Sequence, residues 1–506
     1  MKLEMIEQDL AAKCRELPWS KTTDYNESSF QETKELLDPL FKQFGFGEVL
    51  GSMSEIWRME RAISFWEKYP FDSPILPDGK LSIATFYTRA YNGGIERVQA
   101  ELIKIWLDMG FRVVLITEEG KTPLDYPYPN NVKRFVIPHS GEMTQRLKAI
   151  QRIILEERIS VYVNHLWFDS SIIWESTLMK INKIPFINYQ HGAFTIIYGT
   201  GQEFSYLCHR AFRLCSMIVS LSESAARFHQ LCGCSSIYIH NPIPAHLKSV
   251  KENSKCVLNK RILWIGRIAE EKRTKDALLM MRELLEVVPD ATLDIVGQPE
   301  KSYGEETYTL CNDLKLSANV RFHGYQKDVS EYYKNCDVLI MTSETEGFPL
   351  VLQEANAYGI PCVMYQLPFL SDITSEYGII TVPLGRTELM AEAVSNLLLD
   401  DKKRWEYAKR SRKRFEEMQA YDIQNAWQRI FTLCFGADEQ YEDFFDPKEL
   451  KEYEKRIIPG VFAEQYHALE VIRRDSLDYR FGHHLLTIPR NISHIVRQIT
   501  GRYGKV

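Results

Sequence analysis

The chain has 506 residues, 45% of them hydrophobic, and a formal net charge of -6. This length is too great for one ordinary hydrophobic core, so two or three domains are expected. The mild negative charge argues against a nucleic-acid partner, and no run approaches the length of about 18 continuous apolar residues that a transmembrane helix needs.

Cysteine usage and the start of the chain bear on the cellular compartment. The ten cysteines are scattered and form no C-x-x-C pair. A large chain with scattered cysteines is typical of a reducing compartment. The segment from Met1 to Met5 carries charges and lacks an apolar signal core. We therefore expect a cytoplasmic protein.

Residues 1 to 79 are predicted to form a helical extension. Ser29 to Glu32 matches a capping box, and Ser54 to Tyr69 is a second amphipathic candidate. Prolines at positions 70 and 74, followed by the turn Pro77-Asp78-Gly79, end this region. The sequence assigns it no chemical role.

From residue 80 to residue 246 the pattern alternates between strands, turns and helices. The strand Ser82 to Tyr87 is followed by a glycine turn and by a helix from Ile95 to Met109. Further strands are expected at Val113–Thr117, Val132–Ile137, Val161–Asn164, Phe186–Tyr189 and Met217–Leu221. This alternation predicts a doubly wound parallel sheet. Ser222, after the last of these strands, is an ordinary helix N-cap candidate.

A second series of the same kind is expected from residue 259 to residue 435. Asn241-Pro242-Ile243-Pro244 and a polar run after it indicate an interdomain linker. The series comprises a helix at Thr274–Val288 and strands at Arg261–Ile265, Thr292–Val296, Val320–His323, Val338–Met341 and Cys362–Tyr365. The fold class is therefore α/β, with two doubly wound Rossmann-like domains facing across a cleft.

Residues 436 to 506 are predicted to be a helical tail with a basic, amphipathic end. The last 36 residues carry seven basic side chains and two acidic ones. A basic amphipathic helix is a candidate for an anionic membrane surface. A helix packed on the protein body, with its cations facing water, explains the same pattern, so both readings stay open.

The most informative segment runs from Thr345 to Gly359. It follows an apolar strand, turns at Gly347 and enters a helix with Pro349 near its first position. Glu346 then lies at the carboxyl end of a strand and Glu354 on the next helix. In open α/β sheets ligands bind at that edge, so the two carboxylates can bind separate hydroxyls of one elongated ligand. On spacing alone, a turn residue and a solvated helix residue explain the pair equally well.

Three motifs in order give this chain a family resemblance. The Glu346 to Glu354 spacing resembles the E-x7-E signature of retaining nucleotide-sugar glycosyltransferases, of the family 4-like, group 1 type. These enzymes also carry an Arg and a Lys earlier in the chain, matched here by Arg267 and Lys272, and a Gly-Gly turn before Glu-Arg, matched by residues 93 to 97. The resemblance covers residues 80 to 435 and implies the GT-B fold.

The resemblance also implies site residues. Glu346 would contact hydroxyls of the donor sugar and Glu354 the ribose, while Arg267 and Lys272 would bind the diphosphate. His191 resembles the family histidine near the reacting sugar, whereas His165 is expected to be structural or on the acceptor side. The donor-binding candidates are Gly93, Gly94, Gly266, Gly297, Gly347, Phe348 and Leu350, and residues 322 to 325 are expected near the base.

The chemistry explains why such residues are needed. Departure of a diphosphate gathers negative charge on oxygen, so fixed cations aimed at it are the largest available aid. Arg267 can donate two parallel hydrogen bonds to phosphate, and Lys272 supplies a point charge. A helix that begins near residues 347 to 350 adds N–H donors and its dipole. Without the motif, Arg267 and Lys272 would be ordinary solvated charges.

The prediction is a retaining transferase that moves a hexose or N-acetylhexosamine, expected to come from UDP, to a glycan, lipid-linked or protein acceptor in cell-surface polysaccharide synthesis. No D-x-D motif follows a strand, so no metal and no cofactor is expected. The tail suggests a peripheral position on the inner face of the membrane. Two alternatives stay open: a sugar-nucleotide epimerase or phosphorylase on the same fold, and a non-catalytic glycan-binding protein.

Overall fold

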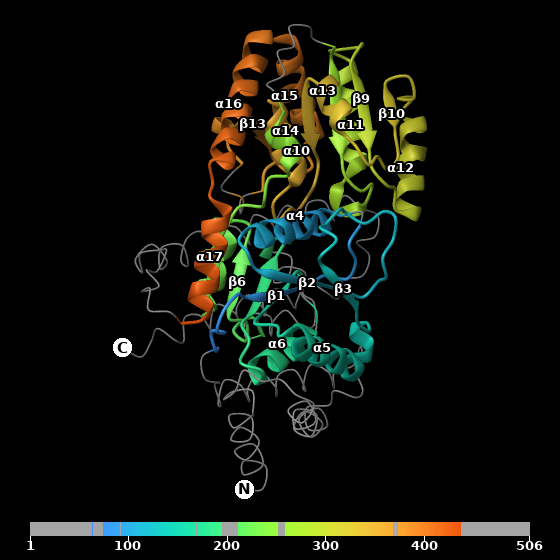
Figure 1. Cartoon of the computed structure of the whole chain (residues 1–506). Helices are drawn as coiled ribbons and strands as arrows, with labels where there is room; N and C mark the ends of the chain where they lie inside the picture. Colours follow the sequence, from blue (N-terminus) through green and yellow to red (C-terminus); the bar gives the residue numbers. More distant parts are fainter. Residues whose placement is uncertain are drawn as a thin grey trace, which may run out of the picture. The chain divides into compact units, whose positions relative to one another are not determined.

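A computed structural model shows the chain as two compact units (Figure 1). The structure describes residue 63 and residues 74–436 apart from 92, 168, 170, 195–210, 251–258, 368–369 and 371–372. Of these, the first unit contains the residues up to Pro242 and those from Asp422 onward, and the second contains Ile243 to Tyr421. Nearly all of the predicted helical extension and the predicted basic tail lie outside the described residues.

The first unit is built on a parallel sheet of seven strands. The strands are β1 (Ser82–Phe86), β2 (Arg112–Thr117), β3 (Lys133–Val136), β4 (Val161–Asn164), β5 (Phe186–Gln190), β6 (Met217–Ser220) and β7 (Ser236–Tyr238). Their order is β3-β2-β1-β4-β5-β6-β7. The order reverses between β1 and β4, which pair in parallel with Thr85 opposite Val163. In doubly wound sheets this is the point where ligands bind.

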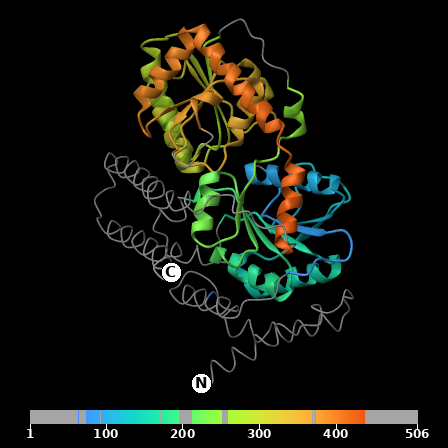
Figure 2. The same ribbon diagram turned by 90° about the vertical axis from the view of Figure 1, so that its left-hand side faces the viewer.

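Helices cover both faces of this sheet (Figure 2). They are α4 (Gly94–Asp108), α5 (Met143–Glu157), α6 (Ser171–Ile181) and α9 (Glu223–Leu231), with a short 3₁₀ turn, η2 (Ser140–Glu142). The α4 helix buries Val98, Leu102 and Trp106 at helical spacing. The Ser222 side chain accepts a hydrogen bond from Ala225 N at 3.2 Å and caps α9, which confirms the expected N-cap.

The second unit holds a parallel sheet of six strands. These are β8 (Arg261–Ile265), β9 (Thr292–Val296), β10 (Val320–Phe322), β11 (Val338–Met341), β12 (Cys362–Tyr365) and β13 (Ile379–Val382). Their order is β10-β9-β8-β11-β12-β13, so the reversal falls between β8 and β11. The central strands β11 and β12 are continuous, fully buried apolar runs, as expected of a sheet that is buried on both faces.

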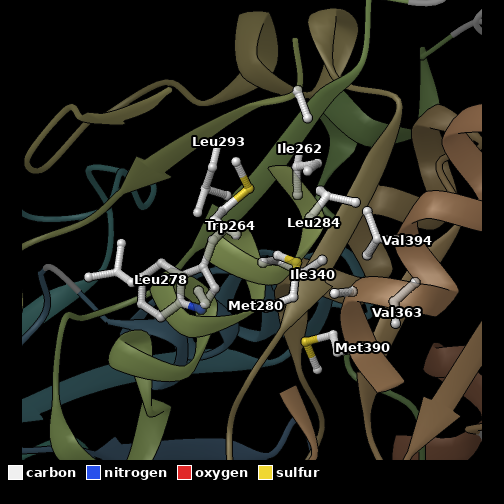
Figure 3. Close-up of a cluster of buried hydrophobic side chains, with 14 of the residues drawn as sticks. Ile262, Trp264, Leu278, Met280, Leu284, Leu293, Ile340, Val363, Met390 and Val394 are labelled. Atoms are coloured by element: carbon white, nitrogen blue, oxygen red, sulfur yellow. The ribbon is translucent and has the colours of Figure 1, made fainter. Parts of the chain in front are cut away.

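The core of the second unit lies between its sheet and two long helices. Trp264 on β8 and Met280 on α11 (Thr274–Leu285) pack together with Met390 and Val394 on α15 (Thr387–Leu399) (Figure 3). The other helices of the unit are α10 (Ala245–Lys248), α12 (Lys301–Asp313), α13 (Ser330–Asn335), α14 (Leu350–Tyr358) and α16 (Asp401–Gln419). Two 3₁₀ turns, η3 (Glu270–Lys272) and η4 (Ser375–Tyr377), complete it.

One helix returns to the first unit after the second is complete. The helix α17 (Ile423–Cys434) places Trp427 edge-on against Trp106 of α4, with ring centroids 4.9 Å apart. Phe431 packs in the same way against Phe111 at 5.5 Å. The expected second domain, residues 259 to 435, runs through α17, whereas the structure divides the units at Tyr421. The difference arises because the aromatic face of α17 is buried on the first unit.

The predicted fold class is confirmed: each unit is a doubly wound, Rossmann-like parallel sheet. The predicted strands match within one residue at each end, and two strands, β7 and β13, were not predicted. Among the described residues no helix is both long and apolar enough to span a membrane.

Candidate active site

The candidate donor site lies at the switch point of the second sheet. Arg267 and Lys272 follow β8, while Glu346 follows β11, and these two strands are direct neighbours. Because the carboxyl ends of parallel strands meet at one edge, residues about 70 positions apart in sequence come together there. The structure thus brings the two most specific motifs of the second unit to one place.

The centre of this site is an ion pair between Lys272 and Glu346. Lys272 Nζ lies 2.8 Å from Glu346 Oε1, and their side chains are 23% and 13% exposed. The pair is therefore largely shielded from water yet still reachable by a ligand. A cation and a carboxylate at this distance can separate, so that the cation binds a phosphate and the carboxylate a sugar hydroxyl.

Hydrogen bonds join the loop after β8 to the loop after β11. Trp264 Nε1 donates to Thr342 Oγ1 at 2.9 Å, and the Thr342 hydroxyl donates to the backbone oxygen of Lys272 at 2.7 Å. The backbone N–H of Glu344 donates to Glu271 O at 3.1 Å. Side chains on well-anchored backbone lose less freedom when they bind a ligand. The backbone that carries the Lys272–Glu346 ion pair is therefore held by hydrogen bonds between the two loops.

Arg267 is held by two carboxylates. Arg267 Nη2 lies 2.5 Å from Glu271 Oε1, and Nη1 donates to Glu300, the residue that directly precedes α12. The Arg267 side chain is 57% exposed, so water surrounds both of its ion pairs. Each of them is therefore a weak interaction. Sequence reasoning missed Glu300. A phosphate at Arg267 would have to replace these two carboxylates.

Glu354 lies on α14, four residues after Leu350, as expected for one helix face. The carboxylate is 5% exposed and accepts a hydrogen bond of 2.6 Å from the hydroxyl of Tyr333, which is fully buried on α13. The helix itself begins at Leu350 with Pro349 at the N-cap and no side-chain cap. Gly347, Phe348 and Leu350 are only partly buried around this helix start. A ligand can therefore approach the positive end of its dipole.

Two glycines let the loops after β8 and β9 touch. Gly297 has a φ of +153°, and a Cβ there would lie 1.7 Å from the backbone oxygen of Gly266. Only glycine fits such an approach.

Farther along this edge, His323 Nε2 lies 2.7 Å from Asp294 Oδ1. Burial opposes ionisation of Asp294, but hydrogen bonds from Arg261 and His323 outweigh it and hold its pKa below the ordinary value.

In the first unit, Gly93 is the N-cap residue of α4 and Gly94 is the first residue of that helix. A Cβ on Gly93 would lie 2.0 Å from Glu96 Oε2, so Gly93 leaves room for that carboxylate at the helix N-terminus. Glu96 is 2% exposed and pairs with Arg89 at 2.7 Å. The Gly-Gly-Ile-Glu motif is therefore a compact turn that places a carboxylate over the positive end of α4.

His191 comes directly after β5, and His165 comes directly after β4. His191 Nε2 lies 2.9 Å from His165 Nδ1, and the two rings are stacked. Burial lowers the pKa of His191 to about 3 and holds that of His165 well below its ordinary value. Both rings are therefore neutral at pH 7.

The predicted residues thus fall into two groups. Arg267, Lys272, Glu346, Glu354 and the glycines at 266, 297 and 347 belong to the second unit, with Phe348 and Leu350. Gly93, Gly94 and His191 belong to the first. Within the described part of the chain, no group of three or more His, Cys, Asp or Glu side chains is placed to hold a metal ion.

Comparison with known families decides what kind of protein carries this site. Residues 249–414 match the model "Glycosyl transferases group 1", and residues 92–246 match "Glycosyltransferase Family 4". Together the two matches cover well over half of the chain, in the order of its two sheets. This chain is a glycosyltransferase of the family 4 and group 1 type. The predicted enzyme class is confirmed.

Individual relatives agree with that assignment. An uncharacterized glycosyltransferase of Haemophilus influenzae is 26% identical over 285 residues, which are 54% of this chain and 77% of the relative. The lipopolysaccharide 1,6-galactosyltransferase of Salmonella typhimurium is 34% identical over 107 residues, which are 20% of this chain and 28% of that enzyme. The second match covers well under two thirds of its relative.

Solved structures share the fold. The Anabaena protein Alr3699/HepE in complex with UDP has a TM-score of 0.56 and 16% sequence identity, over 70% of this chain and 98% of that one. At this identity the likeness concerns the fold alone. This glycosyltransferase has the GT-B fold, built from two Rossmann-like units, and two of its relatives are named as lipopolysaccharide enzymes.

Proposed function

We propose that this glycosyltransferase is retaining and takes a UDP-hexose or UDP-N-acetylhexosamine as donor. The observation that carries the proposal is the Lys272–Glu346 pair, 2.8 Å apart at the carboxyl edge of β8 and β11. It offers one cation for phosphate and one carboxylate for sugar hydroxyls at the point where such sheets bind ligands. The UDP complex of a protein with the same fold supports the choice of nucleotide.

In the proposed reaction the bond between the anomeric carbon and the diphosphate oxygen breaks. Lys272, Arg267 and the start of α14 stabilise the negative charge that gathers on the leaving diphosphate. Glu346 holds sugar hydroxyls, and Glu354 holds the ribose. An acceptor hydroxyl forms the new bond on the face that the diphosphate leaves, and its proton passes to a phosphate oxygen. The anomeric configuration is therefore kept.

The acceptor is proposed to be a glycan or a lipid-linked glycan of a cell-surface polysaccharide. The names of the lipopolysaccharide relatives support this class. We also propose a position at an anionic membrane surface through residues 480 to 506. Deletion of that segment should then release the enzyme from vesicles of anionic lipid, and salt should weaken the intact contact because it screens exposed charge. Equal vesicle binding with and without the segment contradicts this part of the proposal.

The decisive experiment begins with thermal shifts of the full chain against a panel of nucleotide sugars. Mass spectrometry and NMR of products formed with candidate acceptors then follow. We expect a UDP-sugar to raise the melting temperature and the product to keep the α configuration of the donor. Inversion at the anomeric carbon would refute the retaining reaction. Epimer formation without acceptor, or a requirement for inorganic phosphate, would favour an epimerase or a phosphorylase.

Metal independence belongs to the same proposal. Lys272, Arg267 and the helix start can neutralise the diphosphate without a divalent cation. We therefore expect turnover to persist in EDTA. Loss of turnover that manganese or magnesium restores would show a metal site that this proposal lacks.

A further inference from the structure

Four polar side chains form a continuous hydrogen-bonded chain across the first unit. Gln99 Nε2 on α4 donates to Thr85 Oγ1 on β1 at 3.0 Å. Thr85 Oγ1 lies 3.0 Å from His165 Nε2, and His165 Nδ1 lies 2.9 Å from His191 Nε2. The chain crosses the neighbouring strands β1, β4 and β5 at or near their carboxyl ends. The hydrogen-bonded chain ends at His191, which is the only titratable side chain among the candidate site residues of this unit, Gly93, Gly94 and His191.

The direction of these hydrogen bonds follows from counting protons. Thr85 is fully buried, and its hydroxyl oxygen already accepts from Gln99. A buried hydroxyl proton without an acceptor is costly. Among the described residues, the acceptor within reach of that proton is His165 Nε2. Thr85 therefore donates to His165 Nε2, which leaves the proton of the neutral His165 ring on Nδ1.

The same count then fixes the ring of His191. His165 Nδ1 donates to His191 Nε2, so Nε2 must carry a lone pair. Burial lowers the pKa of His191 to about 3, which keeps the ring neutral. A neutral imidazole carries one proton, and that proton must be on Nδ1. The His191 side chain is only partly buried, and none of the described residues makes a hydrogen bond to its Nδ1.

We propose that Gln99, Thr85 and His165 are positioning residues that hold His191 as its Nδ1–H tautomer, so that His191 donates a hydrogen bond to an oxygen of a sugar bound at the carboxyl edge of the first sheet. His191 then cannot take a proton from the acceptor hydroxyl, because its one lone pair is already occupied by His165. The inference rests on the proposed function for the identity of the ligand. The tautomer itself is independent of any ligand.

The relay also explains residue choices that the motif does not. A buried Thr in β1 and a buried Gln on α4 are unremarkable core positions in the sequence. Thr85 is opposite Val163 in the sheet and would pack equally well as valine. The hydroxyl costs desolvation unless it is used. Here the Thr85 hydroxyl and both ring nitrogens of His165 have partners, which is the condition for a buried polar network to rigidify a site.

NMR of the full chain labelled with 15N-histidine tests the inference directly. Long-range proton–nitrogen correlations distinguish protonated from unprotonated ring nitrogens, and the His191 signals are assigned by their loss in His191→Gln. In the wild-type protein at pH 7 we expect a protonated Nδ1 and an unprotonated Nε2. The opposite pattern overturns the inference, whatever the enzyme transfers.

A matched pair of variants at Thr85 adds a second readout. Thr85→Val keeps the shape and removes the hydroxyl proton, which frees His165 to move its own proton to Nε2. We expect the Nδ1–H form of His191 to lose population and kcat to fall about fivefold or more, with KM for the donor little changed. Thr85→Ser should restore both. Wild-type nitrogen signals and kcat in a folded Thr85→Val protein would refute the relay. If this variant does not fold, the spectrum of the wild-type protein alone tests the tautomer of His191.

Discussion

The Tyr333 hydroxyl donates to Glu354 Oε2 at 2.6 Å, inside the second unit. Both side chains are at most 5% exposed. A hydrogen bond to an ionised, buried group is stronger than an ordinary one and holds the carboxylate in one orientation. The carboxylate proposed to bind the ribose is thus set by a residue on the neighbouring helix.

We expect Tyr333→Phe to weaken the binding of free UDP by about tenfold, in line with the loss of one hydrogen bond to a charged group. Glu354→Gln should weaken it as well, and the double variant should add little to the larger single effect. Isothermal titration calorimetry measures all three. The control is Tyr358→Phe, which keeps the ring stacked on Tyr333 at 5.3 Å. If the two losses of affinity were fully additive, Tyr333 and Glu354 would affect UDP binding independently, which would contradict this prediction.

Removal of either candidate phosphate cation should slow the reaction. We expect Arg267→Ala and Lys272→Ala each to reduce kcat by roughly 10²-fold, the scale of one lost charge donor in a transition state. Lys275→Ala is the matched control, because Lys275 lies three residues away on α11 and pairs with Glu306 at 2.5 Å. Steady-state assays with the donor found in the thermal-shift panel measure the effect. Wild-type turnover in either of the first two variants argues against the phosphate role.

Glu300 leads to a prediction of the opposite sign. It competes with any phosphate for Arg267, so Glu300→Gln should tighten the binding of UDP, by up to about fivefold, because exposed ion pairs contribute about 1 kcal/mol or less. Glu306→Gln on the same helix α12 removes the same charge without contacting Arg267. Comparison of the two variants therefore separates the specific contact from a general gain in positive potential. Equal gains in both would leave Glu300 without a special role.

The buried His229 predicts how stability depends on pH. His229 is 1% exposed, burial lowers its pKa to about 3, and neither ring nitrogen has a hydrogen-bond partner among the described residues. The unfolded chain binds a proton there below its ordinary pKa of about 6.5, whereas the folded chain does not. Stability from this group is therefore complete above pH 6.5 and is lost as the pH falls toward 3.

His229→Leu should flatten that dependence. The variant takes up one proton fewer on unfolding, so its free energy of unfolding should fall less steeply with acidification. Between the two pKa values, the slope should be smaller than that of the wild type by about 1.4 kcal/mol per pH unit. Denaturant unfolding at pH 7.5 and pH 5 measures the difference, with the exposed His139 replaced by Gln as control. His165 and His191 titrate in the same direction, so some dependence should remain in the variant. An unchanged slope would mean that His229 is protonated in the folded protein.

Much of the fold followed from local pattern. Strands such as Val338–Met341 are continuous apolar runs between turn residues, and their bounds were predicted without error. The strands β7 and β13 were missed because three or four residues at a sheet edge carry little pattern of their own. The placement of α17 was missed because its amphipathic sequence does not say which of two sheets will bury its aromatic face.

The candidate site was predictable where a motif carried it. Lys272 and Glu346 could be paired in advance, because both follow strands and the sheet order at a switch point is regular. Glu300, Tyr333, Thr85 and Gln99 could not. They belong to ordinary helix and strand positions, and their roles arise from contacts between segments that the sequence does not place together.

The return of α17 to the first unit has a consequence for biosynthesis. The surface formed by Trp106, Phe111 and Tyr189 is covered by Trp427 and Phe431, from the very end of the described chain. During translation, the strands of the first unit's sheet emerge from the ribosome long before these two residues do. Through that interval the nascent protein carries an uncovered aromatic surface, and the second unit can fold as a whole before the first is finished. The vulnerable period for aggregation or chaperone capture should therefore last until Phe431 has left the ribosome.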